Sequence, residues 1–74
     1  MSKVIKLKTT YIELGQFLKL INLISTGGHA KSYLAENDVL VNGVVEKRRG
    51  RKLYTGDTVA ISGESFEIQS SDLD

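Results

Sequence analysis

Hydrophobic and polar residues alternate with a period of two at the start of the chain. Segment 4–8 places Ile5 and Leu7 on one side and lysines on the other, which is the pattern of a half-buried β-strand. The strand could extend to Tyr11 or Ile12, because the threonines before them also favour extended backbone. A strand with one core-facing side is therefore expected to begin the fold.

A helix is predicted next, because apolar residues then recur at intervals of three and four. The stripe consists of Leu14, Phe17, Leu18 and Ile21. The helix could begin after Thr10, with Glu13 completing a capping box, or after Glu13, with Gln16 in that role. We prefer the later start, because Ile12 continues the strand pattern. The apolar face is widened by Leu20, Leu23 and Ile24. We therefore expect a largely covered helix with Lys19 on its exposed side.

Segment 25–28 contains two glycines, which are expected to end this helix and start another. Thr26 is the candidate N-cap of the second helix. Its buried stripe is predicted to consist of Ala30, Tyr33 and Leu34. Asn37 is a suitable left-handed residue to stop the helix. Together, the two short helices would form a hairpin joined by a tight turn.

The rest of the chain reads as short strands separated by turns. Asn42-Gly43 between valine-rich arms predicts a β-hairpin, because both turn positions need positive φ. Gly56-Asp57 predicts a turn before a strand at 58–61, and Ser62-Gly63 a turn before a strand at 64–68. In the last strand Phe66 and Ile68 should face the core, with Glu67 facing out.

These elements predict one α+β domain over residues 1–74. Two short helices would pack on one side of a small, mostly antiparallel sheet of about four to five strands. Residues 69–74 are polar and are expected to form a flexible tail.

Composition excludes several classes of function. The chain has no cysteine and one histidine, so we expect no disulfide, no metal site and no cofactor. It contains no Ser-His-acid pattern and no carboxylate pair in an apolar setting, so we expect no enzyme and no small-molecule substrate. The start has no continuous apolar run, and no segment approaches the length of a membrane span. A small cytoplasmic domain without membrane contact is expected.

Charge is distributed unevenly along the chain, although the net charge is only +1. Residues 46–52 carry a net charge of +4, whereas residues 53–74 contain five acidic residues and no basic one. A protein of this kind can present a basic face to a polyanion while its acidic part points elsewhere.

The candidate binding residues in the basic run are Lys47, Arg48, Arg49, Arg51 and Lys52. Charge runs are more often solvated loops than binding sites. Two features favour binding here. Three of the five charges are arginines, whose planar fork suits phosphate. The run also joins two predicted strands, so ordering it against a phosphate backbone would cost little entropy.

A second candidate site is the predicted start of the second helix. Gly27 and Gly28 would expose backbone N–H groups that suit an anion, with His29 and Lys31 in the first turn. A glycine turn between packed helices explains the glycines equally well, and His29 by itself reads as a surface or capping residue. Tyr54 could stack on a base, although packing at the end of the sheet explains it as well.

The order of these signals resembles a known family, the S4-type RNA-binding domain. The resemblance covers residues 12–61 and rests on segment 14–18, on Ala30-Lys31, on Val39 to Gly43 and on Gly56 to Val59. More narrowly, segments 14–19, 26–28, 30–31 and 48–54 are similar to small stand-alone bacterial proteins called YaaA-like. The family implies an αL-motif fold, binding of structured ribosomal or transfer RNA, and association with ribosomal particles.

One position departs from the family pattern. Many S4-type domains carry arginines where this chain has Gly27 and Gly28, so the basic run and Lys31 would supply more of the charge. Our hypothesis is a non-catalytic protein that binds structured RNA through the basic loop and a helix N-terminus. The alternative is an adaptor that docks an acidic partner protein through the same loop. Binding of duplex DNA through the helix pair is a weaker hypothesis, because the second helix offers few side chains that could read bases in the major groove.

Overall fold

A computed structural model describes residues 2–70 of the chain. The helices are α1 (Leu14–Leu20) and α2 (His29–Glu36). The strands are β1 (Ser2–Leu7), β2 (Tyr11–Glu13), β3 (Leu40–Val41), β4 (Val44–Val45), β5 (Lys52–Tyr54), β6 (Thr58–Ile61) and β7 (Glu64–Ser70). Within this part of the chain, neither helix is long and apolar enough to cross a membrane.

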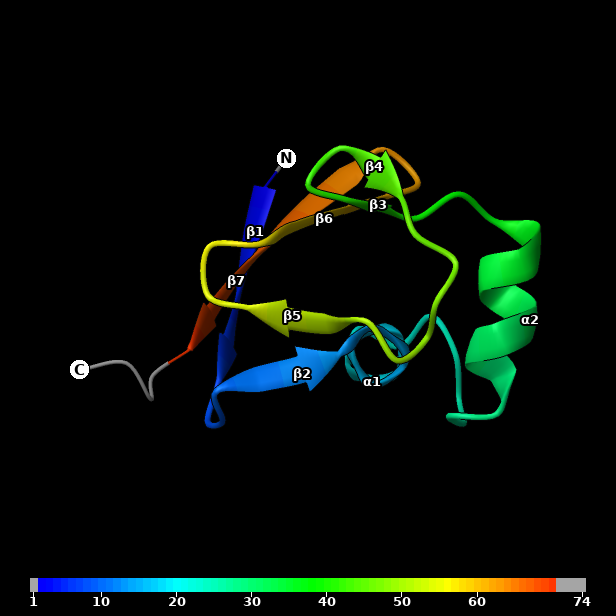
Figure 1. Cartoon of the computed structure of the whole chain (residues 1–74), viewed down its shortest axis with the longest axis horizontal. Helices are drawn as coiled ribbons and strands as arrows, with labels where there is room; N and C mark the ends of the chain where they lie inside the picture. Colours follow the sequence, from blue (N-terminus) through cyan, green and yellow to red (C-terminus); the bar gives the residue numbers. More distant parts are fainter. Residues whose placement is uncertain (1, 71–74) are drawn as a thin grey trace.

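The strands form two sheets, which curve around α1 (Figure 1). The larger sheet has five strands in the order β1-β7-β6-β3-β4, and the smaller one pairs β2 with β5. Only β1 and β7 run parallel among the pairs described, so the predicted mostly antiparallel sheet is confirmed. The α2 helix lies at one end of the molecule, beyond α1 (Figure 1).

The predicted first strand divides into β1 and β2. Leu7 is buried and Ile5 is half-buried, as the alternation predicted. The chain then bends over residues 8–10, where the Thr9 hydroxyl donates a hydrogen bond of 2.8 Å to the Tyr11 carbonyl. The extension of the strand to Tyr11 was therefore wrong as one continuous element. The bend lets the same chain contribute to two sheets, with Ile12 packed against the core from the second one.

The α1 helix begins after Glu13, which confirms the later of the two predicted starts. It ends at Leu20, because Asn22 adopts a positive φ of 65° that a helix does not tolerate. The expected continuation of the apolar face is wrong, since Leu20 and Leu23 are 54% and 39% exposed. Ile24 is buried, but it lies beyond the helix. Lys19 is exposed, as expected.

The α2 helix begins later than predicted and has Gly28 as its N-cap. Thr26 is not the cap, because its carbonyl instead accepts the His29 N–H at 3.1 Å in the preceding turn. Asn37 ends the helix with a φ of −130°, an extended conformation in place of the predicted left-handed one. Its backbone and side-chain amides both donate to the Tyr33 carbonyl, which satisfies that end of the helix.

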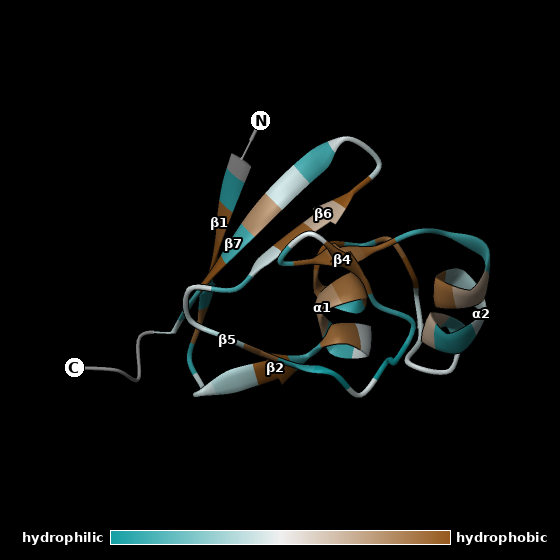
Figure 2. Ribbon diagram, turned by 45° about the horizontal axis from the view of Figure 1, so that its top comes forward, coloured by the Kyte–Doolittle hydropathy of each residue, from teal (hydrophilic) through white to brown (hydrophobic). Residues whose placement is uncertain are grey.

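The core lies between α1, α2 and the two sheets, where hydrophobic positions concentrate on strands and helices (Figure 2). Phe17 of α1 meets Phe66 of β7 edge-on, with ring centroids 5.5 Å apart. The largest fully buried side chains are Phe17, Leu14, Leu18, Leu34, Leu53, Ile68, Val39 and Val59. The buried stripes of both helices are thus confirmed in their main members.

Two hairpins form at the predicted turns. Asn42 and Gly43 have φ values of 53° and 84°, and Ser62 and Gly63 of 51° and 82°. β7 continues to Ser70, whose hydroxyl donates to the Thr9 carbonyl at 2.7 Å. The predicted flexible tail therefore starts too early, because residues 69 and 70 pair with β1. The remainder of that tail, residues 71–74, lies outside the described residues.

One side-chain network joins two turns that are distant in sequence. The Asn42 amide donates to Asp57 Oδ1 at 3.1 Å and its oxygen accepts the Thr58 N–H at 3.0 Å. Asp57 Oδ2 in turn accepts the Tyr54 N–H at 2.8 Å. The Asn-Gly and Gly-Asp signals that the sequence presents as separate turns thus form a single latch between β3 and β5.

Candidate nucleic-acid interface

The basic loop, residues 47–51 between β4 and β5, is anchored through its backbone to the start of α1. The N–H groups of Leu14 and Gly15 donate to the carbonyls of Arg51 and Arg49, both at 2.8 Å. Glu13 makes no side-chain cap, so these loop carbonyls satisfy the first helical N–H groups instead. The loop is therefore a fixed part of the fold and not a free solvated segment.

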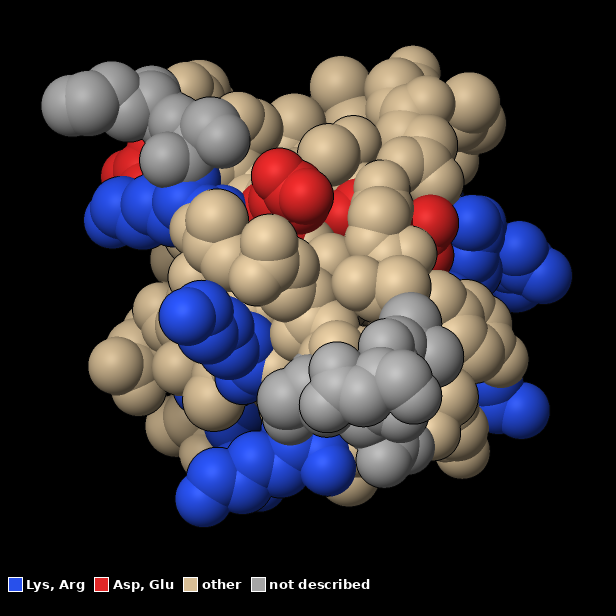
Figure 3. Space-filling model, turned by 90° about the vertical axis from the view of Figure 1, so that its left-hand side faces the viewer, with Lys and Arg blue, Asp and Glu red and all other residues tan. Residues whose placement is uncertain are grey.

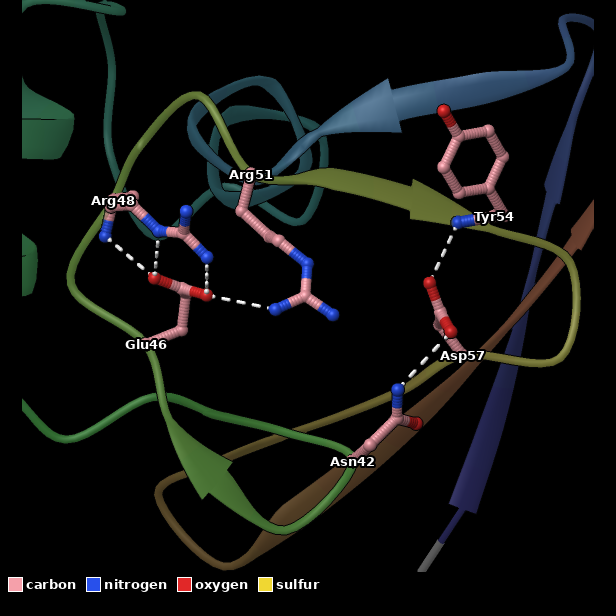
Figure 4. A network of polar contacts seen from close by, with 6 residues as sticks. All are labelled: Asn42, Glu46, Arg48, Arg51, Tyr54 and Asp57. Carbon is pink, nitrogen blue, oxygen red and sulfur yellow. Dashed lines mark hydrogen bonds and ion pairs between the residues drawn. The ribbon is translucent and has the colours of Figure 1, made fainter.

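Glu46 is a buried carboxylate that holds two of the loop arginines (Figure 4). Its Oε2 accepts Arg48 Nε at 2.9 Å and the Arg48 backbone N–H at 3.1 Å. Its Oε1 accepts Arg48 Nη2 at 3.1 Å and Arg51 Nη1 at 2.9 Å. Glu46 is only 8% exposed, so it is a structural centre of the loop.

The arginines stabilise the charged form of Glu46. Hydrogen bonds from the Arg48 side chain are the main cause that lowers the pKa of Glu46 to about 2, although burial opposes the shift. The same contact raises the pKa of Arg48. Arg48 nevertheless keeps 75% of its side chain exposed, against 34% for Arg51. Arg48 can therefore still offer outward-facing donors, while Arg51 is largely committed within the protein.

Lys47 points away from the rest of the basic loop and toward the end of α2. Its Nζ donates to the carbonyls of Leu34 at 2.7 Å and Asn37 at 3.1 Å, and lies 3.4 Å from Asp38 Oδ1. A lysine at this position satisfies the last helical carbonyls and suits the negative end of the helix dipole. Sequence reasoning grouped Lys47 with the binding residues, and the structure gives it intramolecular partners.

Arg49 and Gly27 line one shallow depression of about 190 Å³, together with Glu13, Gly15 and Gln16. The two predicted sites, the basic loop and the glycine start of the second helix, are thus brought to the same face. Arg49 is exposed, and among residues 2–70 the structure pairs its side chain with no carboxylate. Arg49 is the loop arginine best placed to bind an anion.

Gly15 explains why the three segments approach so closely. A Cβ at this position would meet the Ala30 Cβ at 3.3 Å and both the Cβ and the carbonyl oxygen of Arg49 at 3.4 Å. The absence of a side chain therefore lets α1, α2 and the basic loop meet at one point. Gly15 was part of the sequence resemblance, but its role as the junction of these segments needed the structure.

The start of α2 provides less free backbone than the sequence suggested. The N–H groups of His29 and Ala30 donate to the carbonyls of Thr26 and Gly27 in the turn before the helix. A Cβ on Gly27 or Gly28 would meet no atom within 4 Å, so both glycines face open space. His29 and Lys31 are exposed beside them. This region therefore contributes an open approach and side-chain charge more than a row of free N–H groups.

Lys52 and Tyr54 lie on β5 and are both exposed. Tyr54 is 44% exposed, which argues against packing in the core as the reason for its presence. Its ring lies beside that of Tyr11 on β2, and Lys52 Nζ lies 5.1 Å from the Tyr11 ring centroid. Sequence reasoning missed Tyr11, because the residue was assigned to a continued strand. Its alternation with half-buried Ile12 was the signal available.

Acidic residues of the last third of the chain make contacts away from the basic loop. Glu64 lies 3.4 Å from Lys3 in an exposed ion pair, and Asp57 belongs to the latch with Asn42. Viewed from the side opposite α2, acidic side chains gather near the upper middle, with Lys and Arg along the lower and outer margins (Figure 3). No group of three or more potential metal ligands occurs among residues 2–70.

Comparison with known proteins identifies the same module. The family model described as "S4 domain" matches residues 5–69. A Bacillus subtilis (strain 168) protein, named as a probable ribosome maturation protein, RlbA, is 52% identical over 69 residues, which is 92% of this chain and 97% of that protein. YbcJ of Escherichia coli (strain K12), named as a candidate RNA-binding protein, is 38% identical over 61 residues, which is 82% of this chain and 87% of YbcJ.

A solved structure shows the same architecture. The solution structure of YbcJ from E. coli matches with a TM-score of 0.59 and 34% identity, covering 90% of this chain and 84% of that one. That structure is described as containing an αL motif involved in RNA binding. The αL-type α+β fold expected from the sequence is therefore confirmed.

Proposed function

The chain belongs to the S4 domain family, and on this premise we propose that it binds folded RNA through the basic loop and the adjoining start of α2. The observation that carries the proposal is the shared depression beside the N-terminal ends of both helices, which Arg49 of the loop and Gly27 both help to line. The lining combines glycines with an arginine that the structure pairs with no carboxylate among residues 2–70, although Glu13 also lines the depression. Glycines allow close approach and the arginine supplies charge, and a phosphate backbone needs both.

The basic residues would make different contributions to RNA binding. Arg49, Lys52 and Lys31 are exposed and would contact phosphates, while Arg48 would add the donors that Glu46 leaves free. Because this loop is held by backbone hydrogen bonds, little entropy would be lost when RNA binds. Few side chains are placed to read base edges, so the shape of the RNA would be recognised more than its sequence.

The target that fits these features is a structured ribosomal RNA. The relative from B. subtilis is named for ribosome maturation, which supports a role in ribosome assembly. We propose that this role is carried out in the cytoplasm. Transfer RNA is the other folded RNA with a comparable surface. We propose no catalytic step for the chain.

A salt titration of binding to folded ribosomal RNA tests the proposal. Contact with four to six phosphates should give a log–log slope on the order of −3 to −5. Replacing both Arg48 and Arg49 with alanine should weaken binding and flatten the slope. A flat dependence for the unaltered protein, or unchanged binding by the double variant, would contradict the proposal.

Two competition experiments separate the rival readings. An excess of duplex DNA should displace the RNA poorly if shape recognition is correct, whereas efficient displacement would favour a general duplex binder. Partners that co-purify with the protein should be lost after RNase treatment. Retention of an acidic protein through that treatment would favour the adaptor instead.

A further inference from the structure

We propose that the outer face of the β2–β5 ribbon is a stacking platform for an unpaired nucleobase of the bound RNA. The platform consists of Tyr11, Tyr54 and Lys52. This inference rests on the proposed RNA binding and adds a second kind of contact to it. The basic loop would hold the phosphates of folded RNA, and the platform would hold a base that leaves the helical part.

The two tyrosines form a cross-strand pair. Tyr11 lies directly opposite Tyr54 in the antiparallel register, and their ring centroids are 5.7 Å apart at an interplanar angle of 50°. The intervening residues Ile12 and Leu53 point to the other side, where Leu53 is fully buried. The ribbon therefore has one face in the core and one aromatic face in solvent.

Both rings remain accessible although they are in contact. Tyr11 is 39% exposed and Tyr54 is 44% exposed. Single exposed aromatic residues are common on protein surfaces, but two adjacent rings beside a cationic loop form a larger apolar surface. Aromatic side chains next to a basic groove are the usual means by which proteins hold unpaired bases, because every base has a face that can stack.

The backbone under the platform is held on both strands. Tyr54 donates its N–H to Asp57 Oδ2 at 2.8 Å, and its carbonyl accepts the Asp57 N–H at 3.0 Å. On the other strand, the Tyr11 carbonyl accepts the Thr9 hydroxyl. A base that stacks here would meet rings on an ordered backbone, so the entropic cost of binding would be small.

Charge complements the aromatic surface. Lys52 Nζ, 5.1 Å from the Tyr11 ring centroid, is close enough to contact the phosphate of a nucleotide whose base stacks on the pair. Glu13 lies opposite Lys52 in the register and also lines the depression beside Arg49. The ribbon face is thus continuous with the phosphate site. Glu13 disfavours a phosphate between the two cations, so phosphates are expected at Arg49 and Lys52 with bases between them.

The test compares an RNA hairpin that has a blunt stem with the same hairpin carrying an unpaired adenosine tail. The unaltered protein should bind the tailed hairpin about tenfold more tightly, which is within the range measured for stacking of one base. Tyr54→Leu should bring the ratio of the two affinities close to one, because leucine fills similar space without a ring. Tyr54→Phe is the matched control and should keep the preference. Fluorescence anisotropy measures both affinities.

A second measurement uses only the unaltered protein, so its result does not require any variant to fold. Addition of the tailed hairpin should shift the ring proton resonances of Tyr11 and Tyr54 beyond the effect of the blunt hairpin. Tyr33, half-buried on α2, serves as the internal reference. Equal shifts with both hairpins would overturn the platform.

The outcomes distinguish this inference from the proposal on which it rests. Salt-dependent binding of both hairpins with equal affinity overturns the platform and leaves RNA binding by the basic loop intact. Retention of the tail preference by Tyr54→Leu also overturns the platform. Failure of the unaltered protein to bind either hairpin overturns both.

Discussion

Glu46 determines which of the basic side chains are available to a ligand. The sequence shows five cations within six consecutive positions, but the structure divides them into distinct groups. Arg48 and Arg51 bind Glu46, and Lys47 binds the carbonyls at the end of α2. Arg49 and Lys52 remain directed to the solvent. At the scale of single residues, the charge of the loop is therefore partly used for folding.

Glu46→Gln should destabilise the protein and reduce its sensitivity to acid. The pKa of Glu46 is about 2 in the folded state against 4.5 ordinarily, so its contribution is present above pH 4.5 and lost as the pH falls toward 2. We expect a loss of about 1–3 kcal/mol at neutral pH, the range for hydrogen bonds to a charged group. Urea unfolding at several pH values measures both effects.

The control is Glu64→Gln, which removes an exposed carboxylate paired with Lys3. That change should alter the free energy of unfolding by less than about 0.5 kcal/mol. If Glu46→Gln showed the same acid dependence as the unaltered protein, the arginine contacts would not be the source of acid stability.

Lys47→Met and Arg49→Gln should differ in stability, although both remove one charge from the loop. Lys47→Met keeps the aliphatic stem but removes the hydrogen bonds to the Leu34 and Asn37 carbonyls, so it should cost about 1 kcal/mol. Arg49→Gln should stay within about 0.5 kcal/mol. Thermal unfolding of the two variants compares them directly, and equal melting temperatures would refute the capping role of Lys47.

At the scale of elements, the packing of α1, α2 and the basic loop depends on Gly15. Alanine is usually favoured over glycine in a helix by about 1 kcal/mol. Here the new Cβ would press on Ala30 and on the carbonyl of Arg49, which is itself fixed by a hydrogen bond to the Gly15 N–H. Neither neighbour is the end of a flexible chain. We therefore expect Gly15→Ala to destabilise the protein by about 1–2 kcal/mol.

A double-mutant cycle with Ala30→Gly tests this interpretation. If the contact between the two Cβ atoms matters, the double variant should be more stable than the sum of the single effects predicts. Additive effects in urea unfolding would show that strain against the Arg49 backbone dominates.

The latch between β3 and β5 predicts a stronger effect at Asn42 than at the other hairpin. Asn42→Gly keeps the positive φ but removes the side chain that bonds Asp57 and Thr58, so it should cost about 1–3 kcal/mol. Ser62→Gly is the matched control, because Ser62 has a similar φ of 51° at the other turn. Chemical denaturation measures the free energy of unfolding of both variants. Equal losses would mean that the greater flexibility of glycine accounts for the whole effect.

Periodic patterns predicted most of the elements but not how they meet. Spacing of apolar residues located both helices, and Asn42-Gly43 located a hairpin. The early end of α1 depended on the left-handed Asn22, which has no helix-stopping glycine beside it. The cap of α1 consists of carbonyls from residues 49 and 51, which no local pattern can show. The features that sequence reasoning missed are therefore mainly those that depend on contacts between distant segments.

The candidate site shows the same division. Composition pointed to the basic residues as candidates, and only the structure shows that the glycine turn and the loop share a face. The sequence could not show that Glu46 is buried, because a glutamate beside arginines is usually interpreted as a solvated ion pair. Nor could the sequence place Tyr11 beside Tyr54, since their pairing depends on the bend after β1.

At the scale of the whole molecule, the two ends of α1 face different surroundings. The N-terminal end meets the basic loop, whereas the C-terminal end borders a groove of about 340 Å³ with a mixed apolar and charged lining, to which Lys3 and Ile21 contribute. The position of a charge should therefore matter more than the net charge.

Arg49→Gln and Lys3→Gln test this, because each removes one positive charge. Arg49→Gln should weaken RNA binding several-fold and reduce the magnitude of the salt slope by about 1, the effect of one lost phosphate contact. Lys3→Gln should leave the slope unchanged, since Lys3 lies at the other end of α1. Equal slopes for the two variants in salt titrations would mean that binding responds only to overall charge.

The parallel pairing of β1 with β7 has a consequence for the order of events during synthesis. β1 leaves the ribosome first, but its partner residues begin at Ser65. The packing of α1 is also completed late, because Phe17 contacts Phe66, which is synthesised near the end of the domain. Pairing between segments so distant in sequence slows folding. The folded surface that would hold RNA is therefore completed only after β7 has been made, so recognition of folded RNA through that surface would begin only after β7 has left the ribosome.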